Sequence, residues 1–324
     1  MTTYRLMDRF ESESLMMRDT YCSTLMELAE KDKRVVMLDA DLMSSIGSIP
    51  FMEAYPEQVF NIGIQEANMV GIAAGMSATG LIPYAHTFGP FASRRCFDQL
   101  FLSIGYAKLN LRMIGSDPGI TAAYNGGTHM PFEDMGIIRT IPNAIILEPV
   151  DNTMLRDLLI QTKDIYGLVY IRLLRKNAIK IYEDGSSFEI GKGAILEEGV
   201  DLTIIASGIM VIEALNARKA LENEGISAKI VNMFTIKPID HELIIKCAKE
   251  TGAIVTAENH NIINGLGSAV AEVIGENCPI PMERVGVKDE FGEVGSVDYL
   301  RERYNLRAEA IIEAAKRVIR RKGE

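Results

Sequence analysis

The chain has 324 residues, 48% of them hydrophobic, and a formal net charge of −10 at pH 7. This apolar content excludes a globally disordered protein, and the length suffices for two domains of ordinary size. The acidic balance argues against nucleic acid as the main ligand, and the lack of a long apolar run or a signal-peptide core predicts a cytoplasmic protein not associated with membranes.

Strands and helices alternate in the first part of the chain. Strands are predicted over residues 34–38, 59–62, 81–87, 110–115, 144–148 and 168–172, and helices over 14–30, 62–76, 91–107 and 152–163. This alternation predicts an α/β fold with a parallel, doubly wound sheet. Ligands of such sheets bind at the carboxyl ends of the strands, where Asp41, Thr87, the loop beginning at Ser116 and Arg172 are expected.

A composition change near Lys176 and the polar turn 182–187 indicate a linker. A second, smaller α/β unit follows, with strands at 202–206, 228–232 and 253–257 and helices at 210–224 and 241–249. We therefore expect one domain over residues 1–185 and another over 186–324. The four cysteines form no C-x-x-C pair, so no zinc site is predicted.

Residues 62–76 form an apolar, small-residue helix in which Glu66 is the one ionisable residue. An acid in the first turn is stabilised by the helix dipole, which is a sufficient structural reason for it. A carboxylate on a mostly apolar face can also bind a basic heterocycle. Gly71 and Gly75, on the same helix, would allow another backbone to approach closely.

The motif T-F-x-x-F, Thr87 to Phe91, follows the strand predicted at 81–87. Its two rings, Phe88 and Phe91, could be ordinary core aromatics at a turn from strand to helix. They could also form a flat apolar slot for a planar ligand.

The sequence G-I-x-E-x-N-M, the small-residue helix, a strand and T-F-x-x-F together resemble the pyrimidine-binding domain of the transketolase family of thiamine diphosphate enzymes. The segments M-F-T-I-K-P-I-D, A-E-N-H and G-L-G-S-A-V are similar to the C-terminal domain of the same family. The resemblance implies that Glu66 hydrogen-bonds N1′ of the cofactor's aminopyrimidine and that Phe88 and Phe91 hold this ring. Asp41, just after the first strand, is a further candidate for cofactor binding.

The family's G-D-G motif, which holds the diphosphate and Mg²⁺, is absent from this sequence. The length is also similar to the latter half of a full transketolase. The resemblance therefore implies the C-terminal subunit of a split enzyme. The expected partner is a separate N-terminal subunit that carries G-D-G and Mg²⁺ and shares the thiamine diphosphate. Self-association through the Glu66 helix would give a heterotetramer.

Substrate residues are implied by the same resemblance. The loop Y-N-G-G-T-H-M-P is similar to the family segment D-G-P-T-H-Q-P, so His129 is expected to hydrogen-bond the donor sugar and to act in catalysis. Asn125 stands where transketolases carry an aspartate. Arg172 and Ser45 approximately match residues that bind substrate phosphate, whereas Asp117 would repel phosphate. The expected activity is transfer of a two-carbon ketol unit between sugar phosphates.

Three alternatives stay open from the sequence. The chain could be the β subunit of a 2-oxoacid dehydrogenase, which has a similar length and architecture. It could carry out chemistry like that of deoxyxylulose-phosphate synthase, which the segment Phe97-Asp98-Gln99 supports. It could also be a non-catalytic regulatory subunit that has kept the fold.

Overall fold

The computed structural model describes residues 2–323. The chain divides into two compact units. The first comprises residues 3–118 and 137–188, and the second comprises residues 119–136 and 189–323 together with residue 2. This division differs from a single boundary at residue 185, because the loop 119–136 has most of its contacts with the second unit.

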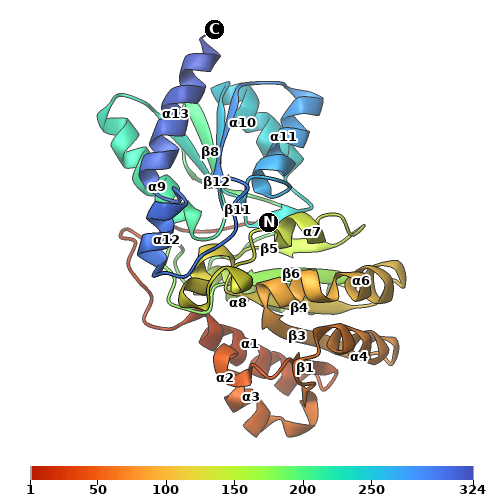
Figure 1. Ribbon diagram of the computed structural model, residues 1–324. Helices are drawn as coiled ribbons and strands as arrows, with labels where there is room; N and C mark the ends of the chain where they lie inside the picture. Colours follow the sequence, from red (N-terminus) through yellow and green to blue (C-terminus); the bar gives the residue numbers. More distant parts are fainter. Residues whose placement is uncertain (1, 324) are drawn as a thin grey trace. The chain divides into compact units, whose positions relative to one another are not determined.

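The first unit contains a parallel sheet with helices between its strands. Its strands are β1 (Val35–Asp39), β2 (Val59–Asn61), β3 (Ile82–Phe88), β4 (Leu111–Ser116), β5 (Ile145–Leu147) and β6 (Leu168–Leu173). Its helices include α1 (Met17–Lys31), α2 (Met43–Ile46), α3 (Ile49–Ala54), η1 (Pro56–Gln58), α4 (Glu66–Ala78), α7 (Asp134–Ile138, which spans both units) and α8 (Asn152–Thr162). Figure 1 shows β6, β4, β3 and β1 following one another across this unit.

Within the first unit the strands follow the order β5-β6-β4-β3-β1-β2, and each neighbouring pair is parallel. All five residues of β1 and all six residues of β4 and of β6 are buried. Such continuous burial is typical of a parallel sheet that is covered by helices on both faces. The predicted parallel α/β architecture is confirmed.

The predicted helix over residues 91–107 is wrong in detail. The segment is broken into α5 (Gly89–Ser93), η2 (Arg94–Cys96), α6 (Phe97–Gln99) and the π-helical segment η3 (Leu100–Tyr106). The Ser93 hydroxyl donates to the carbonyl of Gly89 at 2.7 Å, and the Ser93 backbone departs from α geometry, with φ −118° and ψ −78°. Serine bonds of this kind compete with regular helix hydrogen bonding, so apolar periodicity alone did not reveal the break.

The second unit is a smaller α/β layer structure. Its elements are η4 (Gly119–Asn125), η5 (Gly127–His129), β7 (Ala194–Glu197), β8 (Leu202–Ala206), α9 (Met210–Asn223), β9 (Ala228–Asn232), β10 (Thr235–Lys237), α10 (His241–Thr251), β11 (Ile254–Asn261), α11 (Leu266–Asn277), β12 (Met282–Val287), α12 (Val297–Arg303) and α13 (Ala308–Lys322). The sheet order is β12-β11-β8-β9-β7, parallel except for antiparallel β7. Figure 1 shows α9 and α13 on one side of this sheet and α10 and α11 on the other.

Within residues 2–323, no helix combines the length and the apolar character needed to cross a bilayer.

Candidate functional site

The carboxyl ends of neighbouring strands in the first unit bring the candidate residues together. Asp39 at the end of β1 is in register with His86 on β3, and Phe88 at the end of β3 is in register with Ser116 on β4. Ser116 is in turn in register with Leu173 on β6. The residues that directly follow these strands therefore lie along one edge of the sheet, as expected for a ligand site in a parallel sheet.

Glu66 begins α4 and is 1% exposed. Its carboxylate accepts a hydrogen bond from the Thr87 hydroxyl at 3.1 Å. Arg95 Nη1 donates to both carboxylate oxygens, at 3.0 and 2.9 Å. A buried carboxylate is costly unless it is paired and hydrogen-bonded, and Thr87 and Arg95 meet that requirement. Because the Arg95 side chain is 44% exposed, this partner can be displaced by a ligand more easily than a buried one.

The two rings of the T-F-x-x-F motif follow Thr87, whose hydroxyl donates to the Glu66 carboxylate. Phe88 and Phe91 have ring centroids 6.4 Å apart and planes inclined at 60°. The guanidinium of Arg95 stacks over the Phe91 ring at 3.9 Å from its centroid, so one arginine bridges Glu66 and Phe91. Burial raises the pKa of the adjacent Cys96 thiol to about 12, with the nearby Glu66 adding to the shift, which argues against a nucleophilic role for this cysteine.

A buried polar network lies beneath this edge. His86 Nδ1 is 2.8 Å from Asp39 Oδ2, and His86 Nε2 is 3.0 Å from the Ser116 hydroxyl. All three side chains are fully buried. Asp39 also accepts from the backbone N–H of Leu42, which starts the loop that contains Ser45. The network thus fixes the ends of β1, β3 and β4 relative to each other, and a fully satisfied network of this kind makes the site rigid.

Two arginines converge on the loop after β1. Arg18 Nη1 donates to the carbonyl oxygen of Ser45 at 3.0 Å, and Arg175 Nη1 donates to the same oxygen at 3.1 Å. Arg175 also forms a bidentate ion pair with Asp117, with Nε at 2.8 and 2.9 Å from the two carboxylate oxygens. The Arg175 guanidinium lies 5.0 Å from the centroid of the Phe88 ring. The predicted residue Ser45 therefore lies beside two cations.

Arg172 is placed differently from its neighbour Arg175. It lies within β6, is fully buried, and forms an ion pair with buried Glu148 at 2.6 Å. This environment supports a structural role, since breaking a buried pair leaves an uncompensated charge. A substrate contact by Arg172 stays a prediction, and Arg175, three residues later, is the more accessible guanidinium.

Asp41 is exposed and adopts a left-handed backbone with φ 65°. Its Oδ1 accepts from the side-chain amide of Asn61 at 3.0 Å, and its own N–H donates to Asn61 Oδ1 at 3.2 Å. Asn61 Oδ1 also accepts from the N–H of Gly63. Asp41 therefore connects the end of β1 to the turn that leads into α4 and Glu66.

The loop with Asn125 and His129 belongs to the second unit. Asn125 is exposed, and His129 Nδ1 shares a hydrogen bond with the Thr128 hydroxyl at 2.9 Å. The Gly-Gly pair between Asn125 and Thr128 is required by the fold: Gly126 has φ 78°, and a Cβ on Gly127 would lie 2.0 Å from the carbonyl oxygen of Gly292.

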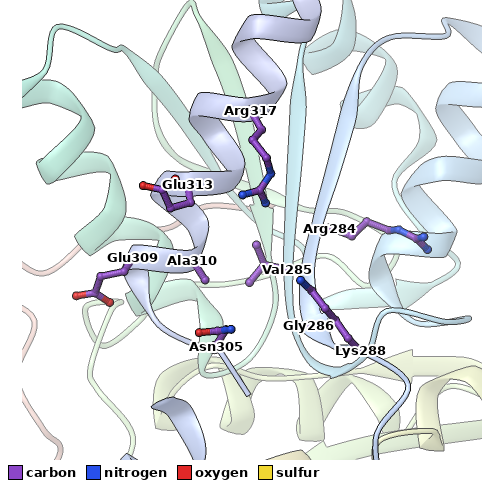
Figure 2. A pocket seen from close by; sticks show the side chains of 9 residues that line it. All are labelled: Arg284, Val285, Gly286, Lys288, Asn305, Glu309, Ala310, Glu313 and Arg317. Carbon is purple, nitrogen blue, oxygen red and sulfur yellow. The ribbon is translucent and has the colours of Figure 1, made fainter. Parts of the chain in front are cut away.

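A cavity of about 260 Å³ lies in the second unit beside β12 and α13, as Figure 2 shows. Acidic and basic side chains share its lining: Glu309 and Glu313 from α13, Arg317 from the same helix, and Arg284 and Lys288 from β12 and the residues after it. The candidate residues described above do not line it.

Comparison with known proteins identifies the family of the chain. The model of the transketolase pyrimidine-binding domain matches residues 13–180, and that of the transketolase C-terminal domain matches residues 191–311. The chain belongs to the transketolase family. This family depends on thiamine diphosphate, and the buried Glu66 carboxylate beside two aromatic rings fits the basic heterocycle of that cofactor.

Individual relatives share most of the chain. It is 51% identical to the 6-deoxy-6-sulfo-D-fructose transketolase subunit SqwH of Clostridium sp. over 96% of both chains. It is 43% identical to a putative transketolase C-terminal section of Methanocaldococcus jannaschii over 94% of this chain and 95% of the relative. A solved split-gene transketolase, described as an inactive β4 tetramer, is 42% identical, with a TM-score of 0.88, and the match covers 96% of this chain and all of that one.

Sequence reasoning missed the charged partners of the site. The sequence predicts Arg172 as the phosphate-binding arginine and assigns no role to Arg18, Arg95 or Arg175. Spacing along one chain does not report which cations reach a given strand end.

Proposed function

We propose that this chain is the C-terminal catalytic subunit of a split transketolase and transfers a two-carbon ketol unit between sugars. The observation that carries the proposal is the buried Glu66 carboxylate at the start of α4, beside Phe88 and Phe91. Bound thiamine diphosphate supplies the carbon nucleophile for this transfer. Glu66 would hold the proton at N1′ of the aminopyrimidine, and the two rings would orient the heterocycle and exclude water from it.

The other candidate residues are proposed to contact different parts of the sugar substrate or to support the cofactor site. Asn125 and His129 are proposed to bind hydroxyl groups of the donor sugar, and His129 to move a proton at its oxygen. Ser45, Arg18 and Arg175 are proposed to bind an anionic group at the far end of the sugar, because guanidinium groups suit bidentate contact with such oxygens. Asp41 would help to hold the turn before Glu66 near the cofactor.

A separate chain with the G-D-G motif is proposed to hold the diphosphate and Mg²⁺. Two findings support this partner. The sequence lacks G-D-G, and similar proteins that this chain spans almost entirely are described as a transketolase subunit and as a split-gene transketolase. Another relative, 34% identical, is named an apulose-4-phosphate transketolase subunit. The names of the relatives therefore include both a sulfonated and a phosphorylated sugar.

The test is a transfer assay with the reconstituted pair of chains. A ketose donor and an aldose acceptor should give the two exchanged sugars, because each bond broken in the donor is re-formed in the acceptor. Pyruvate in place of the ketose should release no CO₂. Decarboxylation of pyruvate with little ketol transfer would instead favour a synthase or dehydrogenase activity. One relative, a 1-deoxy-D-xylulose-5-phosphate synthase, is 35% identical over 46% of its own length.

Self-association is proposed to use the exposed side of α4. Gly71 and Gly75 are exposed, and a Cβ on either would meet no described atom of residues 2–323 within 4 Å. Two large apolar side chains are also exposed. Ile64, just before α4, has an exposed fraction of 70%, and Tyr106, at the end of η3, has one of 81%. A surface of this kind permits close backbone approach of a second copy.

Replacing Gly75 with leucine should weaken self-association by about tenfold or more, because a bulky side chain overfills a close helix contact. The fold should survive, since leucine favours a helix more than glycine does. Sedimentation velocity measures the change. Gly275→Leu in α11 is the matched control, because a Cβ at this exposed helical glycine also meets no described atom within 4 Å. Equal masses for wild type and Gly75→Leu would exclude this surface.

A further inference from the structure

The charges at the Arg18–Arg175 cluster do not match those of a phosphate. The cluster consists of the two guanidinium groups that donate to the Ser45 carbonyl. One of its two positive charges is already compensated, because Asp117 is 2% exposed in its side chain and forms a bidentate pair with Arg175. Asp19 lies 3.7 Å from Arg18 Nε and lowers the positive potential further.

The cluster is nevertheless placed to meet a ligand. The Arg175 guanidinium lies 5.0 Å from the centroid of the Phe88 ring. Phe88 is one of the two rings proposed to contact the cofactor. The Arg18 side chain is 28% exposed, and its Nε is a buried donor without a hydrogen-bond partner among the described residues. In the proposed transketolase reaction, the far end of the sugar is expected to lie at Arg18 and Arg175.

We propose that this cluster selects a sulfonate over a phosphate at the far end of the ketose, with Asp117 as the specificity-determining residue, an inference that rests on the proposed transketolase function. A sulfonate carries one negative charge, whereas a phosphate monoester carries about −1.5 to −2 at pH 7. Both groups offer three acceptor oxygens, so hydrogen-bond geometry discriminates little between them. The second charge of a phosphate would lie close to the Asp117 carboxylate, which already compensates Arg175, and like charges at close range repel strongly.

Asp117→Asn tests this charge effect with little change in shape. The residue has φ 58°, a left-handed conformation that asparagine adopts readily. Asparagine also keeps an oxygen that can accept from Arg175. Asp117→Gly is a second variant, because glycine tolerates the same backbone and removes the side chain altogether.

The measurement is kcat/KM of the reconstituted enzyme for three donors, a ketose 6-sulfonate, the matching 6-phosphate and the uncharged ketose. The wild type should prefer the sulfonate. Both variants should shift the ratio toward the phosphate by roughly ten- to a hundredfold, the scale of one interaction with a charged group. They should change kcat/KM for the uncharged donor much less than they change this ratio. Asp164→Asn, which removes an exposed carboxylate paired with Lys163, is the control for net charge and should leave all three values unchanged.

The outcomes separate the inference from the function on which it rests. Two results would overturn the inference alone, provided that transfer continues. One is a wild-type preference for the phosphate, and the other is an unchanged sulfonate-to-phosphate ratio of kcat/KM in both Asp117 variants. Asp117 would then be only a structural partner of Arg175. Lack of transfer from all three donors, with both chains folded and bound, overturns the proposed function itself.

Discussion

Replacing Glu66 with glutamine is expected to abolish turnover of the two-chain enzyme while the fold survives. The amide is nearly isosteric and can still accept from Thr87. It lacks the charge that stabilises a protonated ring nitrogen, so proton exchange at C2 of bound thiamine diphosphate should slow by roughly 10²–10⁴-fold, the scale of lost general-base assistance. Hydrogen–deuterium exchange followed by NMR measures this step separately from sugar binding.

Glu57→Gln is the matched control for that experiment. Glu57 is also an acid in the first turn of a helix, η1, but it is exposed. Its replacement should leave exchange and turnover unchanged. If Glu66→Gln exchanges the C2 proton as fast as the wild type, Glu66 only stabilises the N-terminus of α4 and the proposed catalytic role is wrong.

The second large effect is expected in cofactor binding. The isolated chain should show no measurable heat with thiamine diphosphate and Mg²⁺, and binding should appear when the partner chain is added. The physical reason is that the diphosphate and its metal carry most of the charge of the cofactor, and this chain lacks the motif that holds them. The Glu66 and Phe88 side would contact only the pyrimidine ring.

Isothermal titration calorimetry provides the measurement, with the chain alone, the partner alone and the mixture. Binding by the chain alone with a dissociation constant of about 1 μM or lower would contradict the split-site proposal, because it would require contacts worth roughly 8 kcal/mol from one half of the site. Glu66→Gln in the mixture should weaken binding less than omission of either chain, since it removes one charged contact and leaves the diphosphate contacts in place.

The sequence by itself could predict structural features that depend on residues close together in the chain. The alternation of strands and helices determines a parallel α/β fold, because apolar runs of strand length followed by helical segments have few other ways to bury their surface. Glu66 is recognisable because it is the one ionisable residue in residues 62–76. The rings of Phe88 and Phe91 follow from the motif in the same way. In each case the informative neighbours are close in sequence.

Only the tertiary structure decided which charges meet at the site. The strand order β5-β6-β4-β3-β1-β2 is not the order of the chain, so the residues after β1, β4 and β6 become neighbours although they are more than 50 residues apart. That order pairs Arg175 with Asp117, brings both toward Ser45, and buries Arg172 against Glu148. The break in the predicted helix 91–107 likewise brings Arg95 to Glu66. Charged side chains extend several ångströms and pair with residues that are close in space but distant in sequence. Periodicity along the chain therefore does not predict these pairs.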